Sequence, residues 1–278
     1  MKLVWSLANR NPQNPHNQYV YDMFYLSIHM AKDLGYETVL YGTSDAIVRI
    51  GEYVDEVYNT DDIEYLLFDD LKMYIWEDRT DDYATIDGDM FLFSKLKFND
   101  NPNIFLSFDQ LIKNDIQKSV NDSLDLLNKI EIVNLIPEWN PLSKNSISTN
   151  LIRWKGNNGL LKYYIESYKK LRELFLENET SIQKINSELS NNKSLISHIL
   201  CEHLLERIVS YYNLSYDELR SAPKNSYSHW QGTEKFDDKN KINGVKLIVE
   251  VHKMTGGTIK SVYNSLISQK LIEPILYN

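Results

Sequence analysis

The first hundred residues alternate between short apolar runs and a longer segment with helical periodicity, and this alternation limits the possible folds strongly. Leu3–Leu7, Thr38–Tyr41 and Tyr83–Ile86 are apolar runs that predict buried strands. Between the first two, Gln18–Leu34 carries apolar residues at helical spacing, and Gly35 is well placed to end that helix. Strands and helices in this order predict a mostly parallel sheet covered on both faces.

The rest of the chain carries further patterns of both kinds. The additional strands that we expect are Glu56–Tyr58, Met90–Phe93 and Ile104–Leu106. The additional helices that we expect are Leu66–Trp76, Leu160–Leu176, Leu195–Tyr212 and two shorter ones after Val245 and Thr258. Asn- and Ser-rich stretches at 140–148 and 187–194 are too short for domain linkers, so we expect one α/β domain with a helical C-terminal third.

Charge and cysteine content exclude several classes of function. Of 278 residues, 39 are acidic and 30 basic, and the formal net charge of −9 argues against a nucleic-acid-binding protein. A single cysteine, Cys201, excludes a disulfide framework or a multi-cysteine zinc site, and we expect it to be a small buried apolar side chain. No stretch approaches the length of a transmembrane segment, so we expect a cytoplasmic protein.

An acidic pair follows the expected strand Tyr83–Ile86. Asp87 and Asp89 are separated by Gly88, and an apolar run follows them. Ligands of parallel α/β sheets bind beyond the carboxyl ends of the strands, and two carboxylates there can share Mg²⁺ or Mn²⁺ with a diphosphate. The triplet itself is common, since roughly five are expected by chance in a chain of this composition. The alternative is a tight acidic turn in which Gly88 supplies a positive φ angle.

A rarer pattern lies near the C-terminus. His229, Gly232 and Lys235 form an H-x-x-G-x-x-K motif, of which roughly 0.02 are expected by chance. An imidazole can bind a cation, a glycine lets the backbone approach phosphate oxygens, and an ammonium group neutralises them. The alternative is a surface loop with an exposed lysine.

Together the two motifs resemble those of nucleotide-sugar glycosyltransferases with the GT-A fold, most closely the retaining family 8 type. The resemblance covers residues 1–240 as scattered motifs. It implies an α/β fold with a Rossmann-like mixed sheet flanked by helices, and a helical C-terminal region. The implied organisation is a nucleotide-sugar-binding catalytic domain at 1–240, with 241–278 as a helical extension of the same domain.

The resemblance also implies roles for particular residues. The residues implied to hold Mn²⁺ or Mg²⁺ on the diphosphate of a UDP-sugar are Asp87, Asp89 and His229. Those implied to contact the donor are Trp5, Ser6, Lys72, Asp87, Gly88, Gly232 and Lys235. Those implied to be catalytic are Asp89, Glu202 and Asn150. For Glu202, residue-level reasoning leaves a second interpretation, the polar flank of an amphipathic helix.

We therefore expect an enzyme that transfers a sugar from a nucleotide diphosphate donor, with retention, to an unidentified saccharide, lipid or protein acceptor. Two other classes remain open. One is a sugar-phosphate nucleotidyltransferase, which would usually carry a glycine-rich loop after the first strand, whereas residues 7–12 have no glycine. The other is a catalytically silent protein that binds nucleotide sugars. If the protein is instead inverting, Glu202 is the candidate base.

Overall fold

The computed structural model describes residues 1–8, 17–64, 67, 70–97, 106–108, 148–155, 159–177, 199–213, 217–218, 226–230 and 236–276. Their contacts divide the chain into two compact units. The first contains Met1–Ile63, Tyr83–Phe98 and Ala222–Asn278. The second contains Glu64–Asp82 and Asn99–Ser221. The chain therefore leaves the first unit twice and returns to it for its last segment.

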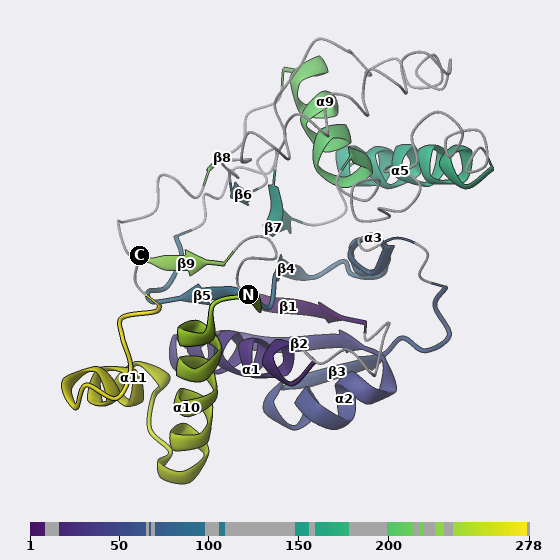
Figure 1. The fold of residues 1–278 in the computed structure, drawn as a ribbon. Helices are drawn as coiled ribbons and strands as arrows, with labels where there is room; N and C mark the ends of the chain where they lie inside the picture. Colours follow the sequence, from purple (N-terminus) through teal and green to yellow (C-terminus); the bar gives the residue numbers. More distant parts are fainter. Residues whose placement is uncertain are drawn as a thin grey trace. The chain divides into compact units, whose positions relative to one another are not determined.

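The first unit is built on four parallel strands in the order β3-β2-β1-β4 (Figure 1). Its strands are β1 (Lys2–Leu7), β2 (Glu37–Gly42), β3 (Glu56–Asn59), β4 (Asp82–Ile86), β5 (Met90–Leu92) and β9 (Tyr227–His229). Its helices are α1 (Asn17–Asp33), α2 (Ser44–Ile50), the short η1 (Gly51–Tyr53), α10 (Lys239–Thr255) and α11 (Ile259–Ser268). The strands β5 and β9 form a separate antiparallel pair. The predicted α/β fold is confirmed.

The core of this unit explains why β1, β2 and β4 were recognisable as apolar runs. Leu3, Val4, Val39, Leu40 and Ala84 are fully buried on these strands. Parallel strands covered on both faces are apolar throughout, without the alternation of a half-exposed strand. Helix α1 packs against β2, β5, α10 and α11, so one helix connects the sheet with the C-terminal helices.

The helix ends follow local rules. After α1, Gly35 has a φ angle of 76°, and the amide of Tyr36 donates to the carbonyl of Ala31 at 3.1 Å. This arrangement is a Schellman motif, as expected for a glycine at that position. At the start of α10, the carboxylate of Asp238 accepts hydrogen bonds from the amides of Asn240 and Lys241.

The second unit combines three strands with helices. Its strands are β6 (Leu106–Phe108), β7 (Ser148–Lys155) and β8 (Asp217–Glu218). Its helices are α3 (Asp70–Asp78), α5 (Gly159–Glu177), the π-turn η3 (Ile199–His203) and α9 (Leu204–Tyr211). Strand β6 pairs antiparallel with β7 and parallel with β8. Helix α5 packs against α3, η3 and α9.

Several expected elements differ from those observed. The helix expected at Leu195–Tyr212 is a π-turn followed by an α-helix, and residues 195–198 lie outside the described part of the chain. The helical C-terminal third also contains the short strands β8 and β9, which the sequence pattern did not predict. Residues 140–147 and 187–194, predicted to be loops, are outside the described residues as well. Within the part that is described, no helix is both long and apolar enough to cross a membrane.

Candidate metal site

The acidic pair lies in a tight turn between β4 and β5. The amide of Met90 donates to the carbonyl of Asp87 at 3.1 Å, which closes the turn. The tight turn of the alternative interpretation is thus present, but Gly88 does not have the positive φ angle which that interpretation assigned to it. A Cβ atom at Gly88 would lie 2.5 Å from Cζ of Phe24 and closer still to two other ring atoms. Glycine is needed here because α1 packs directly on the turn.

Strand β9 brings His229 to this turn. In the antiparallel pairing of β5 with β9, Met90 lies opposite His229. The amide of Trp230 donates to the carbonyl of Asp89 at 3.1 Å and continues the pairing into the turn. The imidazole is therefore held by backbone hydrogen bonds beside the two carboxylates, although it is far from them in sequence.

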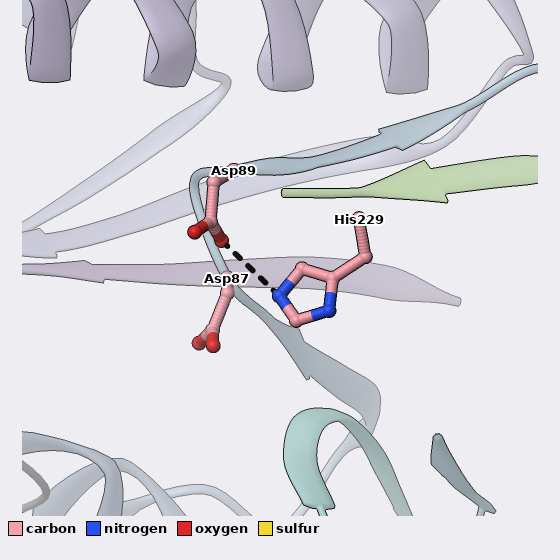
Figure 2. A group of neighbouring side chains, drawn as sticks. All are labelled: Asp87, Asp89 and His229. Atoms are coloured by element: carbon pink, nitrogen blue, oxygen red, sulfur yellow. Dashed lines mark ion pairs between the residues drawn. The ribbon is translucent and has the colours of Figure 1, made fainter. Parts of the chain in front are cut away.

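The side chains of Asp87, Asp89 and His229 form one cluster (Figure 2). One ligand atom from each lies within 4.8 Å of the others. The Nε2 atom of His229 is 3.5 Å from Oδ1 of Asp89, and the two side chains are 5% and 14% exposed. Two ligands bonded to one cation at about 2.1 Å lie at most about 4.2 Å apart, so small side-chain rotations would bring all three onto one ion.

The chemistry of these donors fits a divalent cation. Carboxylate oxygens suit Mg²⁺ and Mn²⁺, and an imidazole nitrogen favours a transition metal such as Mn²⁺ over Mg²⁺. The metal ligands expected from the sequence thus lie together in one unit, at the carboxyl end of a parallel strand, where α/β sheets bind ligands.

A buried hydrogen-bond relay supports the turn from inside. The indole nitrogen of Trp5 donates to Oγ of Ser27 at 3.0 Å, and Oγ of Ser27 donates to the carbonyl of Met90 at 2.6 Å. Trp5 is fully buried. Its indole N–H is therefore used inside the protein, where it links β1 and α1 to the first residue of β5. Ser6, the other residue expected to contact the donor from β1, is partly exposed and pairs with Tyr41 of β2.

Three further predicted residues lie close together in the second unit, around Thr149 of β7. The ammonium group of Lys72 donates to the carbonyl of Thr149 at 3.3 Å, and the amide of Thr149 donates to Oε1 of Glu202 at 3.3 Å. Asn150 is the next residue on β7 and is 8% exposed. Cys201 is also buried, as expected, and its thiol donates to the hydroxyl of Thr149 at 3.4 Å.

The structure removes one interpretation of Glu202. Its side chain is buried, with 3% exposure, so it is not the polar flank of an amphipathic helix. Burial continues along the whole segment. All described residues from Leu200 to Val209 are buried, among them the charged side chains of Glu206 and Arg207, so the segment has no exposed flank on which Glu202 could lie.

Other site residues could not be placed or were missed. Gly232 and Lys235 lie outside the described residues. Sequence reasoning missed Thr149 and Ser27, because a single buried hydroxyl carries no pattern. The one signal for Ser27 is its spacing. It lies three residues after Phe24 on α1, so both side chains are on the face of the helix that packs on the turn.

Comparisons with known proteins give weak similarities. No protein-family model matches the chain, and no curated protein does. Among solved structures, the chain is similar to the glycosyltransferase GlyE of Streptococcus pneumoniae TIGR4, with a TM-score of 0.44 and 7% identity, covering 99% of this chain and 65% of that one. It thus spans less than two thirds of the length of GlyE.

Two further solved structures have similarly low TM-scores and sequence identities. For the CTP:phosphocholine cytidylyltransferase of Streptococcus pneumoniae, the TM-score is 0.40 and the identity 11%, covering 85% of this chain and 97% of that one. For mouse xyloside xylosyltransferase 1, the TM-score is 0.36 and the sequence identity 8%, and the similarity covers 62% of this chain and 75% of that one. TM-scores below 0.5 establish neither a shared fold nor a shared function, so we interpret the site from its own residues.

Proposed function

We propose that the protein is a metal-dependent glycosyltransferase that takes a sugar from a nucleotide diphosphate donor, a UDP-sugar, and passes it to a saccharide, lipid or protein acceptor. The observation that supports this proposal is the cluster of Asp87, Asp89 and His229 at the carboxyl end of β4. Two carboxylates and one imidazole at that edge of a parallel sheet are suited to a cation that also binds a diphosphate.

In this proposal the three side chains would hold Mn²⁺ or Mg²⁺, which would supply positive charge to offset the negative charge that builds up on the departing diphosphate. Asp87 and Asp89 supply one carboxylate oxygen each. His229 supplies Nε2, which must be unprotonated to offer its lone pair. The backbone pairing of β5 with β9 keeps this nitrogen at the turn, so little ordering is required when the cation binds.

The transfer itself forms a bond between the acceptor oxygen and the anomeric carbon and breaks the bond from that carbon to the diphosphate. We propose retention of configuration, on the strength of the H-x-x-G-x-x-K resemblance, and in that case the acceptor proton passes to the leaving diphosphate. Gly232 and Lys235 are proposed to contact the phosphates, with the lysine ammonium adding positive charge. With inversion, Glu202 would be the base.

The buried residues around Thr149 are proposed to act on the donor. Glu202 and Asn150 are proposed as catalytic residues and Lys72 as a donor contact, together with Ser6. For Trp5 we propose an indirect contribution, because its indole is buried and holds the β4–β5 turn through Ser27.

Calorimetry with Mn²⁺ and UDP tests the metal site directly. At a net charge of −9 the protein repels an anionic donor at long range, so UDP should bind weakly without Mn²⁺ and much more tightly with it. Asp89→Ala should abolish the Mn²⁺-dependent part of UDP binding, and Asp89→Asn serves as the matched variant that keeps the side-chain volume. Unchanged UDP affinity in Asp89→Ala would place the site elsewhere.

Lys235→Ala tests the phosphate contact. It should weaken UDP more than uridine, and an equal loss for both ligands would reject a role at the phosphates. UDP release from UDP-glucose, UDP-galactose and their N-acetyl forms then tests transfer or hydrolysis. Release of pyrophosphate from UTP and a sugar phosphate would instead identify a nucleotidyltransferase. NMR of the anomeric proton in the product decides between retention and inversion.

A further inference from the structure

Tyr19 carries a buried hydroxyl group for which no hydrogen-bond partner exists among the residues that the structure describes. The side chain is 5% exposed and lies in the first turn of α1. Its ring packs edge-on against Phe236, with 5.9 Å between the ring centroids. A buried hydroxyl without a partner costs about 1–3 kcal/mol, so its position in the interior calls for an explanation.

The surroundings of Tyr19 connect it with the metal site. Burial raises the pKa of its hydroxyl, and the negative charges of Asp238 and Asp89 raise it further. A tyrosine hydroxyl is protonated at neutral pH and can donate one hydrogen bond. Both neighbouring carboxylates are acceptors, but Oδ1 of Asp238 already accepts the amides of Asn240 and Lys241 at the start of α10.

The helix that carries Tyr19 is fixed to the turn that carries Asp89. Phe24 packs on Gly88, and Ser27 donates to the carbonyl of Met90, so α1 contacts both sides of Asp89. Tyr19 lies five residues before Phe24 on the same helix, so its backbone keeps a nearly constant position relative to this turn. This rigidity is what a group that orients a metal ligand requires.

We propose that Tyr19 is a positioning residue for the metal site, whose hydroxyl donates a hydrogen bond to the carboxylate of Asp89 when a divalent cation is bound. Carboxylates that bind a metal through one oxygen are usually hydrogen-bonded through the other. Oδ1 of Asp89 already lies 3.5 Å from Nε2 of His229, a separation that two ligands of one cation can keep. A donor from α1 to the other oxygen of Asp89 then holds the carboxylate in that orientation. This inference rests on the proposed function of the same three ligands.

The test is Tyr19→Phe, which removes the hydroxyl and keeps the ring that contacts Phe236. By calorimetry, we expect the affinity for Mn²⁺ alone to fall about 10- to 100-fold, the usual cost of losing a group that orients a metal ligand. The melting temperature without metal should be unchanged or slightly higher, because the variant removes a buried hydroxyl that has no partner among the described residues. In an Asp89→Asn background, Tyr19→Phe should change the Mn²⁺ affinity by less than about twofold.

Tyr25→Phe is the matched control on the same helix. The hydroxyl of Tyr25 is hydrogen-bonded to Nδ1 of His252 at 2.7 Å, and His252 is not one of the three ligands. That variant should lower the melting temperature and leave the Mn²⁺ affinity unchanged. Tyr19→Leu, which also lacks the hydroxyl, is the second variant if Tyr19→Phe does not fold.

The outcomes separate the two proposals. If the wild-type protein binds Mn²⁺ and Tyr19→Phe binds it equally well, the role of Tyr19 is overturned and the metal site stands. If Tyr19→Phe lowers the melting temperature without metal and leaves Mn²⁺ binding unchanged, the hydroxyl donates to the carboxylate of Asp238 instead of Asp89. That result also overturns the inference. If the wild-type protein does not bind Mn²⁺, the proposed function fails first, and the inference fails with it.

Discussion

Replacing Gly88 by alanine should disturb the turn that carries Asp87 and Asp89, because the ring of Phe24 already fills the space beside it. The added Cβ would lie 2.5 Å from Cζ of Phe24, whereas non-bonded carbons pack at about 3.5–4.0 Å. Two other atoms of the ring would be closer still, so the turn or the ring must move by more than about 1 Å. Phe24 is 8% exposed, so its ring has packed neighbours that oppose such a movement.

The expected cost follows from two opposing effects. Overpacking a well-packed site typically costs about 1–3 kcal/mol. Restricting the unfolded chain by replacing glycine with alanine returns about 0.4–1 kcal/mol. We therefore expect Gly88→Ala to lower the free energy of unfolding by about 1–2 kcal/mol. Because the turn positions both carboxylates, the affinity for Mn²⁺ should also fall about tenfold or more.

Urea unfolding and Mn²⁺ calorimetry measure the two effects. The control is Gly159→Ala at the first residue of α5, where an added Cβ would meet no atom within 4 Å and where we expect no loss of stability. In the double variant Phe24→Leu/Gly88→Ala, the smaller side chain makes room for the methyl group, so the combined loss should be smaller than the sum of the two. A Gly88→Ala protein with wild-type stability and Mn²⁺ affinity would refute the close contact between α1 and the turn.

Two further predictions concern α1. Burial, then the positive charges of His252, Lys32 and Lys253, lower the pKa of His29 from 6.5 to about 4, so the unfolded chain binds a proton more readily than the folded one. Stability should thus decline as the pH falls from about 6.5 towards 4, by about 1 kcal/mol between pH 7 and 5 after allowing for partial exposure. His29→Phe should reduce this decline in urea titrations, and an unchanged pH dependence would contradict the reasoning. Ser27→Ala, which leaves the Trp5 indole and the Met90 carbonyl without their shared partner, should cost about 2 kcal/mol of unfolding free energy, and a loss below about 0.5 kcal/mol would show that the relay is not important.

The parallel sheet of the first unit could be predicted because its strands are buried on both faces. Leu3–Leu7 and Tyr83–Ile86 are nearly uninterrupted apolar runs and need no partner to be recognised. Strand β9 could not be predicted in this way. It has three residues, Tyr227–His229, and it exists because the backbone of β5 supplies its hydrogen bonds. A strand of that length has no periodicity of its own.

The candidate site, too, could be predicted only where its residues belong to a recognisable sequence pattern. Asp87, Asp89 and His229 could be proposed as a group because each belongs to a motif with a chemical meaning, and the structure brings them together. The environment of Glu202 could not be predicted, since charged side chains between apolar ones are typical of an amphipathic helix, whereas Glu202, Glu206 and Arg207 are all buried here. Tyr19 is similar, because no sequence pattern can show that its hydroxyl is buried and has no hydrogen-bond partner among the described residues.

The pairing of β5 with β9 has a consequence for how the protein is made. Chains emerge from the ribosome with the N-terminal part first, so Met90–Leu92 appears roughly 140 residues before its partner strand. During that interval a fully apolar strand has no antiparallel neighbour and is open to pairing with other nascent chains. Asp87 and Asp89 are also synthesised long before His229, so the complete set of three ligands cannot bind metal in the early stages of folding. We therefore expect metal to stabilise the finished protein and to have little effect on chains that end before β9.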